Sequence, residues 1–206
     1  MNRTSTPAGH VASSRSGAGS EPGLRRKVVV ALVVWTLPYA CYRAYYAAGG
    51  EFGMIGQPVS TAQIRAINAV GAAIIGAATI LPLQAMRVRV LRLALPVLGW
   101  IAEVGCCMHA LVDWTLRVLS LTGVYPTQLP ASVWRSFDRR AADLQDLFLN
   151  EPWFFVEGLL WGILAVGLVP ASRRRPWIFS AVASCLLLTV VGILSGLGVI
   201  GSFHLG

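Results

Sequence analysis

The chain has 206 residues, of which 55% are hydrophobic and 13% charged, and its mean hydropathy is +0.64. This composition is too apolar for an ordinary soluble domain and favours the lipid bilayer as the solvent. The formal net charge of +8 would suit nucleic acid, but the basic residues stand in short clusters between apolar segments, where membrane topology explains them. We therefore expect an all-α integral membrane protein and no nucleic-acid partner.

Residues 1–27 are rich in Ser, Gly, Thr, Pro and Ala and predict a disordered basic tail. The apolar stretch that follows has no evident signal-peptide cleavage site, so we interpret it as a retained first span. Residues 28–201 then form one membrane domain. Its five expected spans cover residues 28–48, 64–86, 93–121, 152–170 and 177–200.

Local signals mark the starts of two of these spans. Ser60 and Gln63 form a capping box before the second span. Glu151 and Pro152 place an acid and a proline at the expected first turn of the fourth.

The distribution of lysine and arginine predicts the orientation. Residues 1–27 hold five of the 17 basic residues, and the loops after the second and fourth spans hold three each. These three regions fall on one side of a five-span chain, which the positive-inside rule makes cytoplasmic. We expect a bacterial inner-membrane protein with its N-terminus in the cytoplasm and its C-terminus outside.

The long outer connection contains an amphipathic pattern. Apolar residues recur at helical spacing between residues 132 and 148, with charged residues at the other positions. This predicts a helix lying on the outer interface, which either caps the bundle or gates a site beneath it.

Ionisable residues within the third and fourth spans are the main candidates for function, since charge inside a membrane is costly. His109, Asp113 and Arg117 step about 40° apart around one face of the third span. On the fourth span, Glu157 stands among aromatic residues. The aromatic neighbours of Glu157 are Trp153, Phe154 and Trp161.

The first span adds an aromatic stripe, Trp35, Tyr39 and Tyr42, with Arg43 on its flank. These residues and those of the other two spans permit two interpretations. In one, Arg43 and Arg117 form ion pairs with Glu157 and Asp113 that lock the helices together. In the other, they enclose an outward-facing cavity in which desolvation keeps a carboxylic acid protonated.

In the second interpretation we expect Glu157 to act as the acid, Asp113 as a second carboxylate and His109 as a proton relay. The substrate-binding wall would consist of Trp35, Tyr39, Tyr42, Arg43, Arg117, Trp153, Phe154 and Trp161. Arginines near Glu157 would favour its ionised form and oppose that role. The expected partners are the lipid bilayer and a lipophilic small-molecule substrate.

We expect no metal and no other cofactor. The four cysteines lie in apolar segments without a C-x-x-C motif and are interpreted as packing residues. His109 and Asp113 supply only two ligands, fewer than a protein-held zinc ion requires. In the last span, Gly192 and Gly196 form a small-residue face through which a second copy or a membrane partner is expected to pack.

Two resemblances to known membrane proteins rest on these residues. The segments Gly49-Gly50-Glu51-Phe52-Gly53 and Asn150-Glu151-Pro152-Trp153 resemble those of small actinobacterial multi-pass membrane proteins. Length, span count and acids beside aromatic residues over residues 28–201 are similar to bacterial five-helix membrane-bound terpene cyclases. That second resemblance implies proton-initiated cyclisation of an isoprenoid; it contains no motif matched position by position, so it assigns no catalytic residue.

Three hypotheses remain from the sequence. The chain is an intramembrane enzyme of the lyase or isomerase type acting on an isoprenoid or other lipophilic substrate, a small proton-coupled transporter or transport subunit, or an accessory protein whose ion pairs hold a bundle together.

Overall fold

The computed structural model describes residues 22–129 and 131–200. In that part of the chain, five helical segments are long and apolar enough to cross a membrane, and sheet is limited to two short strands, which confirms the predicted all-α fold class. The helical elements are α1 (Pro22–Ala47), α2 (Thr61–Ala85), α3 (Arg89–Leu121), α4 (Arg139–Gln145), the π-helical turn η1 (Asp146–Asn150), α5 (Glu151–Leu168) and α6 (Ala171–Gly196). The strands are β1 (Gly56–Pro58) and β2 (Trp134–Phe137).

The first helix begins six residues before the expected start, and the second begins three residues before it. Helix α1 already includes Pro22–Lys27, which we expected to belong to the tail, while residues 1–21 and 201 lie outside the described residues. Ser60 caps α2 as predicted, since its hydroxyl oxygen accepts a hydrogen bond from the backbone N–H of Gln63 at 3.3 Å.

The fourth span differs from the prediction. Helices α4, η1 and α5 form one continuous segment, Arg139–Leu168, so the separate interfacial helix expected over residues 132–148 is not what the structure contains. Near the start of residues 132–148 the chain instead forms strand β2, which pairs antiparallel with β1. Asp138 then begins the helix by accepting a hydrogen bond from the backbone N–H of Ala141 at 3.0 Å.

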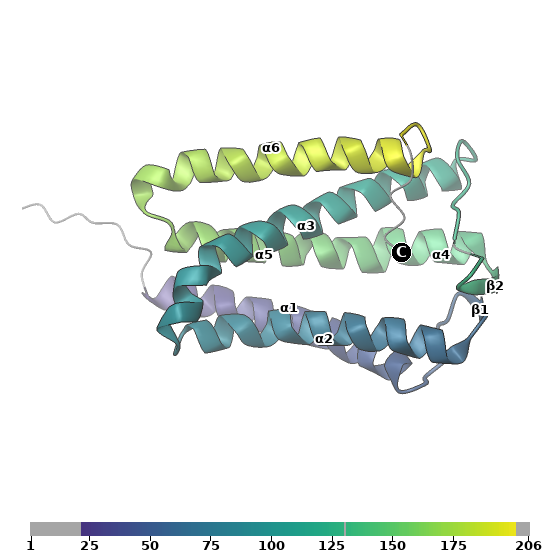
Figure 1. Cartoon of the computed structure of the whole chain (residues 1–206), viewed down its shortest axis with the longest axis horizontal. Helices are drawn as coiled ribbons and strands as arrows, with labels where there is room; N and C mark the ends of the chain where they lie inside the picture. The colour runs from purple at the N-terminus through teal and green to yellow at the C-terminus, as the bar shows by residue number, and fades with distance from the viewer. Residues whose placement is uncertain (1–21, 130, 201–206) are drawn as a thin grey trace, which may run out of the picture.

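The helices form a bundle in which α3 runs obliquely from the side of α2 to the side of α6 (Figure 1). Helix α1 packs along α2, and α5 lies against both α3 and α1. The strand pair β1–β2 closes one end of the bundle, between α4 and the loop after α1 (Figure 1). The α3–α5 interface therefore occupies the centre of the molecule.

Glycines of α6 bring that helix close to α3. A Cβ atom at Gly192 would lie 2.6 Å from Val112, and one at Gly196 would lie 2.6 Å from Leu116. The sequence predicts close packing through this small-residue face, and the structure shows that the face packs against α3 of the same chain. The face that we expected to receive a second copy or another membrane protein is occupied by α3.

Candidate functional site

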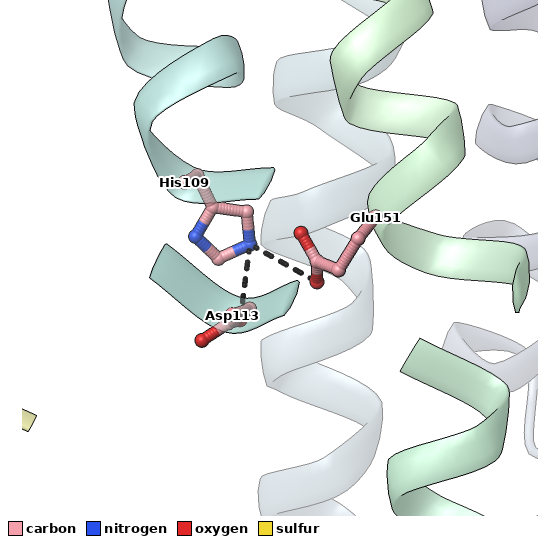
Figure 2. A group of neighbouring side chains, drawn as sticks. All are labelled: His109, Asp113 and Glu151. Carbon is pink, nitrogen blue, oxygen red and sulfur yellow. Dashed lines mark ion pairs between the residues drawn. The ribbon is translucent and has the colours of Figure 1, made fainter. Parts of the chain in front are cut away.

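Side chains of α3 and α5 meet in a cluster of one histidine and two carboxylates. His109 Nε2 lies 3.7 Å from Asp113 Oδ2 and 3.7 Å from Glu151 Oε1. Figure 2 shows the imidazole between the two acids, with the Glu151 carboxylate directed toward the ring. The His109 side chain is 49% exposed, whereas the Glu151 side chain is only 3% exposed. We call these three residues the His–carboxylate cluster.

The cluster depends on the close approach of α3 and α5. His109 and Asp113 lie one turn apart, so their side chains project from the same face of α3. Glycines of α5 leave room for α3: a Cβ atom at Gly158 would lie 2.7 Å from Cys107 Sγ, and one at Gly162 would lie 2.5 Å from the Glu103 carboxyl carbon. This packing brings Glu151 across the interface to His109.

A π-helical turn positions Glu151. Turn η1 ends at Asn150, immediately before Glu151, and the backbone stays helical through both residues. Proline lacks an N–H donor, so Pro152 interrupts the regular hydrogen bonds of the helix, and the wider turn before it accommodates that interruption. Within η1 the Asn150 side-chain amide donates a hydrogen bond to Asp146 Oδ1 at 2.7 Å.

Glu151 is a site residue that we did not predict from the sequence. An acid followed by Pro152 is typical of the start of a helix, where the acid needs no further partner. In the structure the helical segment begins twelve residues earlier, at Arg139, so Glu151 lies inside a helix that is long and apolar enough to cross a membrane. The sequence feature that could have identified Glu151 is an ionisable residue within an apolar span, the same feature that identified His109 and Asp113.

Arg117 belongs to a separate ion-pair network. Its Nε atom lies 2.8 Å from Asp146 Oδ2, and its Nη1 atom lies 3.9 Å from Asp143 Oδ1. Buried Asp143 also accepts hydrogen bonds from the hydroxyls of Ser120 and Thr127. The predicted pairing of arginine with Asp113 and Glu157 is therefore wrong for Arg117, because the two aspartates of α4 and η1 take its guanidinium.

Glu157 lies away from every arginine side chain that the structure describes. No ion pair joins it to Arg43 or Arg117 within residues 22–129 and 131–200, so the structure does not contain the expected pairing of Glu157 with either arginine. Its carboxylate is buried at 4% exposure and is within hydrogen-bonding reach of Trp161, one turn further along α5. Glu157 is also about 9 Å further along α5 than Glu151, given the rise of a helix.

Four of the six predicted aromatic residues come together across α1 and α5, whereas Trp161 belongs to the apolar core. Trp35 stacks on Trp153 with ring centroids 4.6 Å apart, and Tyr39 contacts Trp153 and Phe154 at 5.4 and 5.5 Å. Phe154 in turn meets the His109 ring edge-on at 5.0 Å. These rings therefore form a packed wall that reaches the His–carboxylate cluster.

Tyr42 and Arg43 line a different space, a cavity of about 220 Å³ at the end of the bundle that carries the strands. Asp146 and Asn150 of η1 also line it. Tyr42 accepts a hydrogen bond from Gln145 at 2.7 Å, and the Arg43 guanidinium carbon lies 6.0 Å from the centroid of the Tyr39 ring. The predicted site residues thus divide between this cavity, the aromatic wall and the cluster, while Arg117, Glu157 and Trp161 lie outside all three.

The fold and this arrangement define a multi-pass helical membrane protein with a histidine and two carboxylates grouped inside its spans. No protein-family model, curated protein or solved structure matches the chain. The resemblance to terpene cyclases accordingly stays an expectation from the sequence.

Proposed function

We propose that the chain is an integral membrane enzyme that transfers protons to or from a lipophilic substrate at the His–carboxylate cluster. The observation that carries this proposal is the half-exposed His109 ring held between two carboxylates inside a membrane span. The proposal keeps the intramembrane carboxylate and the isoprenoid class of substrate expected from the sequence, and moves the reacting acid from Glu157 to Glu151.

The depth of the cluster supports an active role. Asp113 lies eight residues before the end of α3 and His109 lies twelve, which corresponds to about 12 and 18 Å along the helix axis. A charged group at the centre of a membrane helix costs about 2.5–3.5 kcal/mol on insertion scales. A chain that only needed a stable bundle would gain by placing apolar residues at these positions.

The chemistry of the three groups fits proton transfer. Two neighbouring carboxyl groups favour sharing one proton over ionising together, and an imidazole can carry a proton between them. An alkene that accepts a proton becomes a carbocation, and loss of a proton from a neighbouring carbon to a base ends the reaction with the proton count restored. The Phe154 ring and the stacked rings beyond it would stabilise such a cation and exclude water.

Glu151 is favoured over Glu157 as the acid because of its surroundings. Glu151 has a base and a second carboxylate within reach, and it opens toward a half-exposed ring. Glu157 packs against Trp161 and the Cys106 region of α3, and its role as the acid stays a prediction.

The test is an untargeted lipid and terpenoid profile of membranes that contain the chain and are supplied with linear prenyl substrates. Glu151→Gln is expected to abolish any new product, while Glu103→Gln is expected to retain it. Glu103 is a matched control because it is a carboxylate of α3 with a buried oxygen that lacks a hydrogen-bond partner in the described chain, packed against Gly162 rather than in the cluster. All variants are compared at equal abundance in the membrane.

Other outcomes of this experiment would reassign the function. Loss of product in Glu157→Gln with product retained in Glu151→Gln would return the acid to Glu157. Identical profiles for membranes with and without the parent chain would contradict the enzyme proposal, and the transport and accessory hypotheses would take its place.

A further inference from the structure

The spacing within the His–carboxylate cluster is unusual for hydrogen-bonded groups. His109 Nε2 is 3.7 Å from an oxygen of each carboxylate, and one ligand atom from each of the three residues lies within 4.8 Å of the others. Hydrogen-bonded atoms would lie about 3 Å apart. Two ligand atoms each about 2.1 Å from one tetrahedral cation lie about 3.4 Å apart. The two separations of 3.7 Å from His109 Nε2 are therefore closer to that of atoms that share an ion. The two carboxylate oxygens, which lie within 4.8 Å of each other, would need to approach to within about 4.2 Å, twice the ligand distance, when an ion binds.

Glu151 supplies an independent indication of a ligand. Its side chain is 97% buried, and Oε2 has no hydrogen-bond partner among the described residues. Figure 2 shows both oxygens of this carboxylate on the side that faces His109. A buried carboxylate oxygen without a partner costs about 1–3 kcal/mol or more, so a group that binds it in the cluster would be stabilising.

The local charge balance also calls for a cation. Four carboxylates lie along the contact of α3 with α4, η1 and α5, namely those of Asp113, Asp143, Asp146 and Glu151. Among the described residues, Arg117 is the arginine that forms ion pairs with this group of carboxylates, and its partners are Asp143 and Asp146. Asp113 and Glu151 are left with a histidine as their partner, so ionisation of both acids would require a further positive charge beside them.

We propose that His109, Asp113 and Glu151 bind one divalent transition-metal cation, with zinc or manganese as the kind that suits an imidazole and two carboxylates. Its charge of +2 neutralises the two carboxylates. Three protein ligands leave further coordination positions for water or substrate, and the exposed ring edge of His109 gives access to them. With an ion bound, the three side chains would be its ligands, and the water that the ion acidifies would replace the shared carboxyl proton as the proton donor.

This inference rests on the residues of the proposed function and adds a cofactor where we expected none from the sequence. The sequence offered two ligands, because His109 and Asp113 share one helix. The third comes from α5, and only the packing of α3 on α5 brings it within reach. The competing arrangement is a proton shared between Asp113 and Glu151, which lie within hydrogen-bonding reach of each other.

The test measures zinc bound to the full chain, purified in detergent with an affinity tag that lacks histidine. The protein is stripped with a chelator, incubated with zinc chloride, desalted and analysed for metal by mass spectrometry. We expect about one zinc ion per chain for the parent and for Glu103→Gln. Glu151→Gln and His109→Gln should hold less than about a tenth of that amount, because losing a direct ligand costs more than the 10–100-fold typical of an outer-shell partner.

Two results would overturn the metal site. One is a parent chain that retains no stoichiometric zinc and no manganese in the parallel incubation, which would favour the shared proton. The other is equal zinc in all four chains, which would place the ion elsewhere, for example on cysteines. Since the parent alone decides the first result, a variant that fails to fold does not obscure it.

Activity separates this inference from the proposed function. Zinc bound through the three residues, with no product from any prenyl substrate, supports the metal site and contradicts the enzyme. Product formation that survives full removal of metal supports the proton-transfer enzyme and excludes a part for the ion in its reaction.

Discussion

Replacing Arg117 by alanine is expected to destabilise the bundle by about 3–5 kcal/mol, the usual result of removing one partner from a buried ion pair. The guanidinium lies 2.8 Å from Asp146, donates a hydrogen bond to Thr127 at 3.1 Å, and is 13% exposed. Asp143, on its other side, is 2% exposed and would keep its charge with only the hydroxyls of Ser120 and Thr127 as donors. The loss should therefore resemble that of an uncompensated buried charge.

The assay is unfolding by sodium dodecyl sulfate in mixed micelles, followed by tryptophan fluorescence. Adding Asp143→Asn to Arg117→Ala should recover part of the loss, because the double variant no longer buries an unpaired carboxylate. A single-variant loss below about 1 kcal/mol, the value of an exposed ion pair, would refute this account of the network.

Three further predictions concern packing, capping and topology. Gly99→Leu should lower the free energy of unfolding by about 1–3 kcal/mol in the same assay, because even a Cβ atom there would lie 2.7 Å from the Ala165 methyl group, and an unchanged value would contradict the α3–α5 contact. Ser60→Ala should cost about 1 kcal/mol by removing the cap on Gln63, whereas Ser60→Asp should retain most of the stability. Exposed Gln128, replaced by cysteine in a cysteine-free chain, should react with a membrane-impermeant maleimide on intact cells; labelling only after lysis would reverse the predicted orientation.

Much of the fold follows from signals that are local in the sequence. A membrane span needs about 20 apolar residues, so hydropathy alone locates five segments, and a hydroxyl at Ser60 marks a helix start that the structure contains. The face shared by His109 and Asp113 follows from helical periodicity, and the structure places the two side chains 3.7 Å apart.

What the sequence could not provide is the pairing of residues from different helices. Arg117 lies one turn from Asp113, yet its guanidinium reaches the aspartates of α4 and η1, whose helical segment was expected to lie on the membrane surface. The π-helical turn before Glu151 adds to the difficulty, because a wider turn shifts the register that a regular 3.6-residue period would predict.

The most direct test of the central claim is product formation by membranes that contain the parent chain, Glu151→Gln or Glu103→Gln at equal abundance. The account predicts a new lipophilic product from the parent and from Glu103→Gln, and none from Glu151→Gln. A product that persists at the parental level in Glu151→Gln would contradict the assignment of the His–carboxylate cluster as the reacting centre.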